Sequence, residues 1–192
     1  MPHTDVNFVK ALGWANEKHK EDYRKGTDIP YFSHLMSVCA LVMESGGNAE
    51  ECIAALLHDV VEDNPNVERE DVAKEFGERV AEIVIGLSDA SAKTGEEKPP
   101  WKARKEKYLE HLRNCDDASI ILVSNADKLH NARSILIDLT DPEIGEKVWD
   151  RFSATREQSL WYYKSLLDIY KEKSPAYRLV RELNEVVDRL QN

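Results

Sequence analysis

The segment "ALLHDVVEDN", residues 55–64, joins an apolar run to one histidine and three acids. Read as a helix, it places His58 and Glu62 four residues apart, and Asp59 and Asp63 likewise, so one face carries an imidazole and three carboxylates. The preceding "IAALL" is apolar on all sides, which is typical of a helix buried in a core. Because unpaired charge at the edge of a core is costly, this segment predicts a compensating partner, and a divalent cation would supply it.

The rest of the chain predicts an all-α fold, because helix start and stop signals recur and no alternating strand pattern is present. Asn48 followed by Glu51 is a reasonable N-cap and N3 pair for the helix that contains the first segment. The opening helix spaces four apolar residues three apart, which predicts that they form its buried face: Val6, Val9, Leu12 and Ala15. Further helices are expected at residues 67–76, 78–87, 101–114 and 117–139, from Asp141 onward, and at about 175–191.

Residues 88–100 form the only long irregular stretch, which is typical of either a lid over a site or a disordered tip. The basic segment that follows, residues 101–108, has two interpretations. It is either a solvated helix face or a surface that folds over a site and meets phosphate oxygens.

Length, charge and cysteine content limit the functional classes. A chain of 192 residues fits one domain with a core large enough for stability. The formal net charge of −10 argues against broad binding to nucleic acid or an anionic membrane, but it leaves room for a small phosphorylated ligand. Three separated cysteines favour structural thiols in a reducing compartment. Since no signal peptide or membrane-spanning stretch is apparent, a cytoplasmic location is expected.

Two further polar stretches stand out. Residues 121–135 carry one polar stripe on an otherwise apolar helix, at spacings i, i+3, i+4 and i+7: Asp127, His130, Asn131 and Ser134. Residues 24–34, "RKGTDIPYFSH", contain a basic pair, a turn, and then Tyr31 and His34 at a helix start. Each stretch also has an ordinary explanation as helix caps or surface groups. A solvated face does not explain residues 58–63, because their flanks are apolar.

These stretches together resemble a known family. His34, then His58–Asp59, then Asp127 reproduce the H…HD…D pattern of the HD metal-dependent phosphohydrolases. Four segments, "HKEDYRKGTDIPYFSH", "AALLHDVVEDN", "FGERVAEIV" and "NADKLHNARSI", resemble in order the hydrolase domain of RelA/SpoT-type alarmone enzymes. The likeness covers about residues 5–170. It implies a single HD domain over residues 1–192, an HD-domain helical bundle with a metal site between core helices, and a relation to stand-alone small alarmone hydrolases.

The resemblance also implies roles for particular residues. His34, His58, Asp59 and Asp127 would be the ligands of one Mn²⁺, and this mixture of imidazole and carboxylate suits that ion. The pair Glu62 and Asp63 matches the catalytic acids of the family. The residues implied in substrate binding are Arg24 at the nucleotide base, its neighbour Lys25, and Asn131 near the sugar or base.

The implied activity is Mn²⁺-dependent removal of the 3′-pyrophosphate from ppGpp or pppGpp, which gives GDP or GTP and pyrophosphate. The turn before His34 departs from the family pattern, since it reads "RKGT" and Leu35 replaces the usual proline, so guanine specificity stays open. Adenine alarmones and the 2′-phosphate of NADPH are alternative substrates for the same metal site. A non-catalytic nucleotide sensor and a purely structural adaptor are alternatives from other classes, and the adaptor leaves the acidic cluster unexplained. The oligomeric state is not determined.

Overall fold

The computed structural model describes residues 5–88 and 99–192, which form ten α-helices and one 3-10 helix with no strand. The helices are α1 (Val6–Lys18), α2 (Phe32–Glu44), α3 (Ala49–Leu57), α4 (Val60–Asp63), α5 (Arg69–Phe76), α6 (Glu78–Leu87), α7 (Trp101–Asn114), α8 (Ala118–Thr140), the 3-10 helix η1 (Gly145–Arg151), α9 (Arg156–Lys173) and α10 (Tyr177–Gln191). The predicted all-α fold is confirmed. None of these helices is both long enough and apolar enough to cross a membrane.

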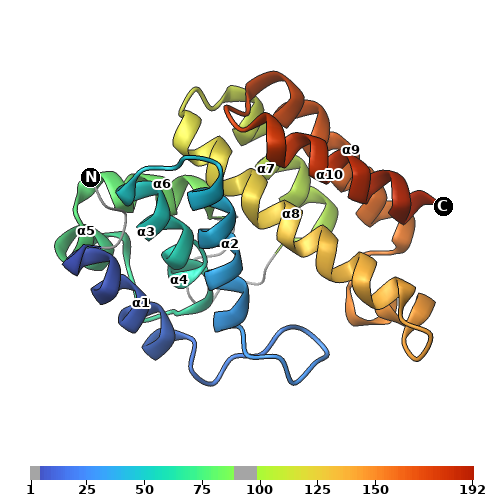
Figure 1. Cartoon of the computed structure of the whole chain (residues 1–192), viewed down its shortest axis with the longest axis horizontal. Coiled ribbons are helices and arrows are strands. Elements are labelled where there is room, and N and C mark those ends of the chain that lie inside the picture. Colours follow the sequence, from blue (N-terminus) through green and yellow to red (C-terminus); the bar gives the residue numbers. More distant parts are fainter. Residues whose placement is uncertain (1–4, 89–98) are drawn as a thin grey trace.

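Helix α8 is the central element of the fold (Figure 1). It contacts α2, α3 and α6 on one side and α9, α10 and η1 on the other. Every residue from Ser119 to Asp127 is buried, including the polar ones. A helix covered on all sides is apolar around its whole circumference, and the isolated polar residues in it need partners inside the protein.

The opening helix α1 forms as predicted, and Leu12 and Ala15 face the core as expected, but the prediction is wrong for Val6 and Val9. Val6 and Val9 are 81% and 65% exposed, whereas Phe8, Ala11 and Ala15 are buried. The two alanines have no bulk beyond Cβ, so the backbone of α1 can lie close to α3, which it contacts. Size complementarity between helices therefore outweighs the larger hydrophobicity of the valines.

The segment that carries His58 and Asp59 is not one continuous helix, which corrects the expectation that one helix face carries His58, Asp59, Glu62 and Asp63. Helix α3 ends at Leu57, the next two residues form a turn, and α4 begins at Val60. The His58 ring Nδ1 lies 2.9 Å from the carbonyl oxygen of Ala55 and donates to it. That carbonyl would accept from the Asp59 amide in a regular α-helix, so the side chain competes with the helix at this point.

The helices after α4 lie close to their predicted positions. A glycine with φ +95°, Gly77, separates α5 from α6, and α10 corresponds to the C-terminal helix expected at about 175–191. The helix expected to begin at Asp141 is wrong: a turn follows instead, and a 3-10 helix starts at Gly145. The φ of Gly145 is +55°, which does not continue an α-helix. Of the irregular stretch 88–100, residues 89–98 lie outside the described part of the chain.

Helix α3, which leads into the His58 turn, begins at a complete capping box. The Asn48 side chain accepts from the Glu51 amide, and the Glu51 carboxylate accepts from the Asn48 amide. We expect Asn48→Ala to reduce the free energy of unfolding by about 1 kcal/mol, as measured by urea titration. Asn48→Ser keeps a side-chain acceptor and should remain close to the parent. An equal loss in both variants would contradict the capping role.

Candidate metal centre and adjoining cavity

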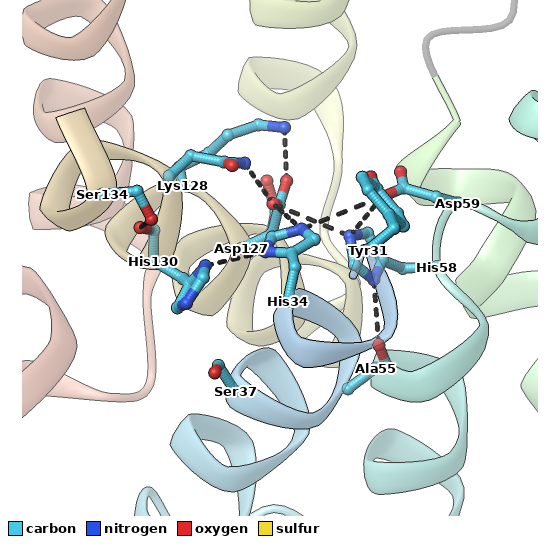
Figure 2. A network of polar contacts seen from close by, with 12 residues as sticks. Tyr31, His34, Ser37, Ala55, His58, Asp59, Asp127, Lys128, His130 and Ser134 are labelled. Atoms are coloured by element: carbon cyan, nitrogen blue, oxygen red, sulfur yellow. Dashed lines mark hydrogen bonds and ion pairs between the residues drawn. The ribbon is translucent and has the colours of Figure 1, made fainter. Parts of the chain in front are cut away.

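Four side chains from three parts of the chain meet beside α8 (Figure 2). His34 comes from the first turn of α2, His58 and Asp59 from the turn between α3 and α4, and Asp127 from the middle of α8. His34, His58 and Asp127 are buried, and Asp59 is partly buried. The structure thus brings together all four residues predicted to bind a cation.

The ligand atoms of this cluster lie within a few ångströms of one another. His34, His58 and Asp59 each offer one atom, all within 4.8 Å of each other. The Asp59 Oδ2 atom is 2.8 Å from His58 Nε2, and Asp127 Oδ1 is 3.2 Å from His34 Nε2 and 3.7 Å from His58 Nε2. Asp127 therefore lies against both histidines, although it is not part of the tightest group.

The two histidines fit a cation because both Nε2 atoms are buried and make no directed hydrogen bond among the described residues. His58 uses Nδ1 to donate to Ala55. His34 uses Nδ1 in a 2.8 Å contact with Nδ1 of His130. A ring that donates through Nδ1 has its lone pair on Nε2, which is the arrangement that metal-binding histidines use.

Charges within the cluster shift the pKa values of its members. Burial lowers the pKa of His34 despite the neighbouring Asp127. At His58 burial opposes the charged ring, but the carboxylates of Asp59 and Asp127 outweigh it and raise the pKa. Both carboxylates have lowered pKa values, because nearby cationic groups overcome the cost of their burial. The cluster therefore keeps two carboxylates ionised inside the protein, which favours a cation between them.

Three neighbours hold these carboxylates in place. The Tyr31 hydroxyl donates to Asp59 Oδ2. Lys128 Nζ lies 2.5 Å from Asp127 Oδ2, and Asn131 Nδ2 lies 2.5 Å from Asp127 Oδ1. The sequence interpretation assigned no role to Tyr31 or Lys128. The dipeptide Asp127–Lys128 gave a signal for the second, since a lysine in a buried helix requires an acidic partner.

The acids Glu62 and Asp63 belong to α4 and are exposed, and both line a cavity of about 190 Å³ together with Asp59 and Asp127. Partial desolvation and the charges of Asp59 and Glu62 raise the pKa of Asp63 to about 7. A carboxyl group with a pKa near neutrality can both accept and release a proton there. Because both acids lie in the short helix that follows Asp59 directly, they can face a molecule bound at the cluster.

Arg24, Lys25 and Asn131 line a second, larger cavity of about 490 Å³. Arg24 Nη2 donates to Asn131 Oδ1 at 2.7 Å, and Asn131 in turn donates to Asp127. Lys25 Nζ lies 5.9 Å from the centre of the Phe152 ring in the same cavity wall. The three residues predicted to bind substrate thus line one cavity, and two of them, Arg24 and Asn131, are linked to the metal cluster by hydrogen bonds.

The two cavities are neighbours, because they share five lining residues: Tyr31, Lys105, Lys128, Asn131 and Tyr162. Lys105 belongs to the basic segment 101–108, and its Nζ lies 5.3 Å from the centre of the Tyr162 ring. This segment therefore contributes at least one side chain to the site and is not only a solvated face.

Comparison with known proteins agrees with this geometry. The model of the HD domain family matches residues 11–157. The chain belongs to the HD-domain family. The cluster described above is this HD domain's His/Asp group, and such a group suits a divalent cation.

The curated relatives of this HD domain are of the RelA/SpoT type. Guanosine-3′,5′-bis(diphosphate) 3′-pyrophosphohydrolase of Aquifex aeolicus is 34% identical over 71% of the chain. A protein named as a probable enzyme of the same kind in Synechocystis is 30% identical over 95% of the chain. The bifunctional (p)ppGpp synthase/hydrolase SpoT of Escherichia coli is 32% identical over 70%. The chain spans only 19%, 24% and 19% of these three relatives.

Solved structures cover the HD domain more fully. A metazoan ortholog of SpoT, described as hydrolysing ppGpp and as having a role in starvation responses, superposes with a TM-score of 0.78 at 26% identity. That match covers 97% of this chain and 96% of the other. A structure from Listeria monocytogenes superposes with a TM-score of 0.68, also at 26% identity, over 81% of this chain and 96% of that one.

Proposed function

We propose that the chain is a Mn²⁺-dependent phosphohydrolase that removes the 3′-pyrophosphate from (p)ppGpp-type nucleotides. We further propose that residues 1–192 act as a single HD domain located in the cytoplasm. The products are GDP or GTP and pyrophosphate. Curated relatives and a solved structure named for ppGpp hydrolysis support this activity.

The observation that carries the proposal is the charge of the larger cavity. The formal net charge of the chain is −10, yet the described lining residues include one acid, Asp138, and five cationic side chains: Arg24, Lys25, Lys105, Lys128 and Arg151. Asp138 is paired with Arg151, and Lys128 is paired with Asp127 of the neighbouring cluster. A positive cavity of about 490 Å³ beside a His/Asp cluster suits a small ligand that carries several phosphates.

The residues divide into cation-binding, proton-accepting and ligand-holding groups. His34, His58, Asp59 and Asp127 would hold the cation. When bound, a divalent cation lowers the pKa of a water molecule and offsets charge on the attacked phosphate. Glu62, assisted by Asp63, takes the proton from the attacking water. Water adds to the phosphorus next to the 3′ oxygen and the bond from that phosphorus to the 3′ oxygen breaks, so that pyrophosphate is released and the 3′ oxygen takes up a proton to become a hydroxyl.

The larger cavity, which contains Arg24, holds the rest of the ligand. The Arg24 guanidinium stacks on a purine and is oriented by Asn131. Stacking alone does not tell guanine from adenine, so we propose that both purines are cleaved, with guanine preferred modestly.

A panel of nucleotides tests this function. The Mn²⁺-loaded chain should release pyrophosphate from ppGpp and pppGpp, and more slowly from the corresponding adenine alarmone, with products identified by mass and ion-exchange chromatography. Turnover of NADPH with none of either alarmone would replace the proposal with a 2′-phosphatase. Binding without any turnover would favour a nucleotide sensor.

Arg24→Ala separates base contact from chemistry. We expect KM to rise by about tenfold for both purines, the loss of one stacked and charged contact, with Mn²⁺ content unchanged. Arg113→Ala on α7 is a suitable control because Arg113 is exposed and lines neither cavity. An unchanged KM for both purines would remove Arg24 from the base site.

A further inference from the structure

His130 lies between the metal cluster and the larger cavity. It lines that cavity, and its ring centre is 4.8 Å from that of His34. The ring centre of His34 is in turn 5.2 Å from that of His58, so the three rings form a row with His34 in the middle (Figure 2). The sequence placed His130 in the polar stripe of residues 121–135 and assigned it no role of its own.

The rings of His34 and His130 contact each other through the same atom of each ring, Nδ1. Nδ1 of His34 is 2.8 Å from Nδ1 of His130. At this distance one nitrogen carries a proton and donates, while the other accepts through its lone pair. The two neutral rings therefore have opposite tautomers, and the direction of the bond is fixed once one tautomer is known.

The metal cluster fixes that direction. His34 Nε2 is buried, makes no hydrogen bond among the described residues and lies 3.2 Å from Asp127 and 3.9 Å from Asp59. A cation held by these carboxylates needs the Nε2 lone pair, so the His34 proton must be on Nδ1. His130 then accepts at Nδ1 and must carry its own proton on Nε2. Among the described residues, the structure shows no acceptor for that Nε2–H.

We propose that His130 is a positioning residue that holds His34 as the Nδ1–H tautomer and presents its own Nε2–H to the phosphorylated ligand in the larger cavity. The first part needs only the metal site. The second part rests on the function proposed above. One neutral side chain thereby links ligand binding to the orientation of a metal ligand.

Two substitutions separate the two parts. The Oδ1 atom of an asparagine occupies nearly the place of the histidine Nδ1, so His130→Asn keeps the acceptor for His34 but loses the donor to the cavity. His130→Leu loses both. We expect His130→Leu to weaken Mn²⁺ binding about 10- to 100-fold, as for other neighbours of metal-binding histidines. His130→Asn should bind Mn²⁺ almost as tightly as the parent and raise KM for ppGpp up to about tenfold.

The tautomers are read directly by ¹⁵N NMR of the imidazole nitrogens in the chain loaded with Zn²⁺, which is diamagnetic. We expect a protonated Nδ1 on His34 and a protonated Nε2 on His130. A protonated Nδ1 on His130 would overturn the proposal. Equal Mn²⁺ affinity of both variants would overturn the positioning role, and an unchanged KM in His130→Asn would overturn the donor role.

The controls keep these outcomes distinct from failure to fold and from failure of the proposed function. His111→Asn alters an exposed histidine that lines neither cavity and bonds to the Gly86 carbonyl, and it should change neither readout. If His130→Leu does not fold, the tautomers and His130→Asn still decide the positioning role. If no nucleotide is hydrolysed, the NMR and Mn²⁺ measurements stand unchanged, because they require no turnover.

Discussion

Chelation of the divalent cation should abolish hydrolysis and lower the melting temperature. The proposed ligands come from α2, from the α3–α4 turn and from α8, so a bound cation joins three parts of the chain. A ligand that binds only the folded state at 100 times its Kd stabilises it by about 2.7 kcal/mol. For a domain of this size each kcal/mol corresponds to about 2 to 4 °C in Tm.

The measurement is differential scanning calorimetry with and without chelator, followed by return of Mn²⁺, in parallel with an assay of pyrophosphate release. His58→Ala should imitate chelation, because it removes a buried ligand, and Mn²⁺ should no longer raise its Tm. His111→Ala is the matched control outside the cluster. Full turnover in the chelated chain would disprove the metal assignment.

Glu62→Gln and Asp63→Asn should each reduce kcat by about 10²-fold or more, which is the usual contribution of a general acid or base. Both changes keep the size of the side chain and remove its charge. Mn²⁺ content should stay nearly unchanged, because neither residue is a proposed ligand. Loss of Mn²⁺ from Glu62→Gln would show that Glu62 belongs to the metal site instead.

Asp63→Asn should also stabilise the metal-free chain at pH 8. The folded pKa of Asp63 is about 7, above its ordinary value of 3.8, so folding favours the protonated form. As pH rises from 4 to 8, the unfolded state ionises first, and the folded state loses stability relative to it. Removal of this charge beside Asp59 and Glu62 relieves that loss. A Tm that falls at pH 8 relative to the parent would contradict this account.

A higher Tm combined with a lower kcat in Asp63→Asn would indicate that Asp63 is present for the reaction and not for folding. Residues kept for folding alone usually destabilise a protein when changed. A cluster of like charges that destabilises the metal-free chain is instead expected at a site where a cation and a reaction require them.

Local sequence was sufficient for most of the helices and for the types of side chain in the site. Caps such as Asn48 with Glu51, and the glycine at position 77, act within a few residues, so helix starts and ends near them were predictable. The motif around His58 and Asp59 indicated a cation for the same reason, because an apolar flank next to an imidazole and acids is a local pattern.

Local sequence was not sufficient where side-chain competition or packing between helices decides the outcome. The break between α3 and α4 depends on the His58 ring, which takes the Ala55 carbonyl. The buried face of α1 depends on how closely its alanines approach α3, and the hydrophobicity of Val6 and Val9 gave the wrong face.

The sequence by itself determined an all-α chain with an HD motif. The resemblance to a known family indicated which side chains would form the site. Only the tertiary structure decided which of these side chains meet. Tyr31 with Asp59, His34 with His130, and Arg24 with Asn131 are pairs separated by 28, 96 and 107 residues. Helical periodicity fixes which residues share one face of one helix. Contacts between helices depend on how the whole core packs, and this packing produced the hydrogen-bonded links and the positive cavity beside the cluster.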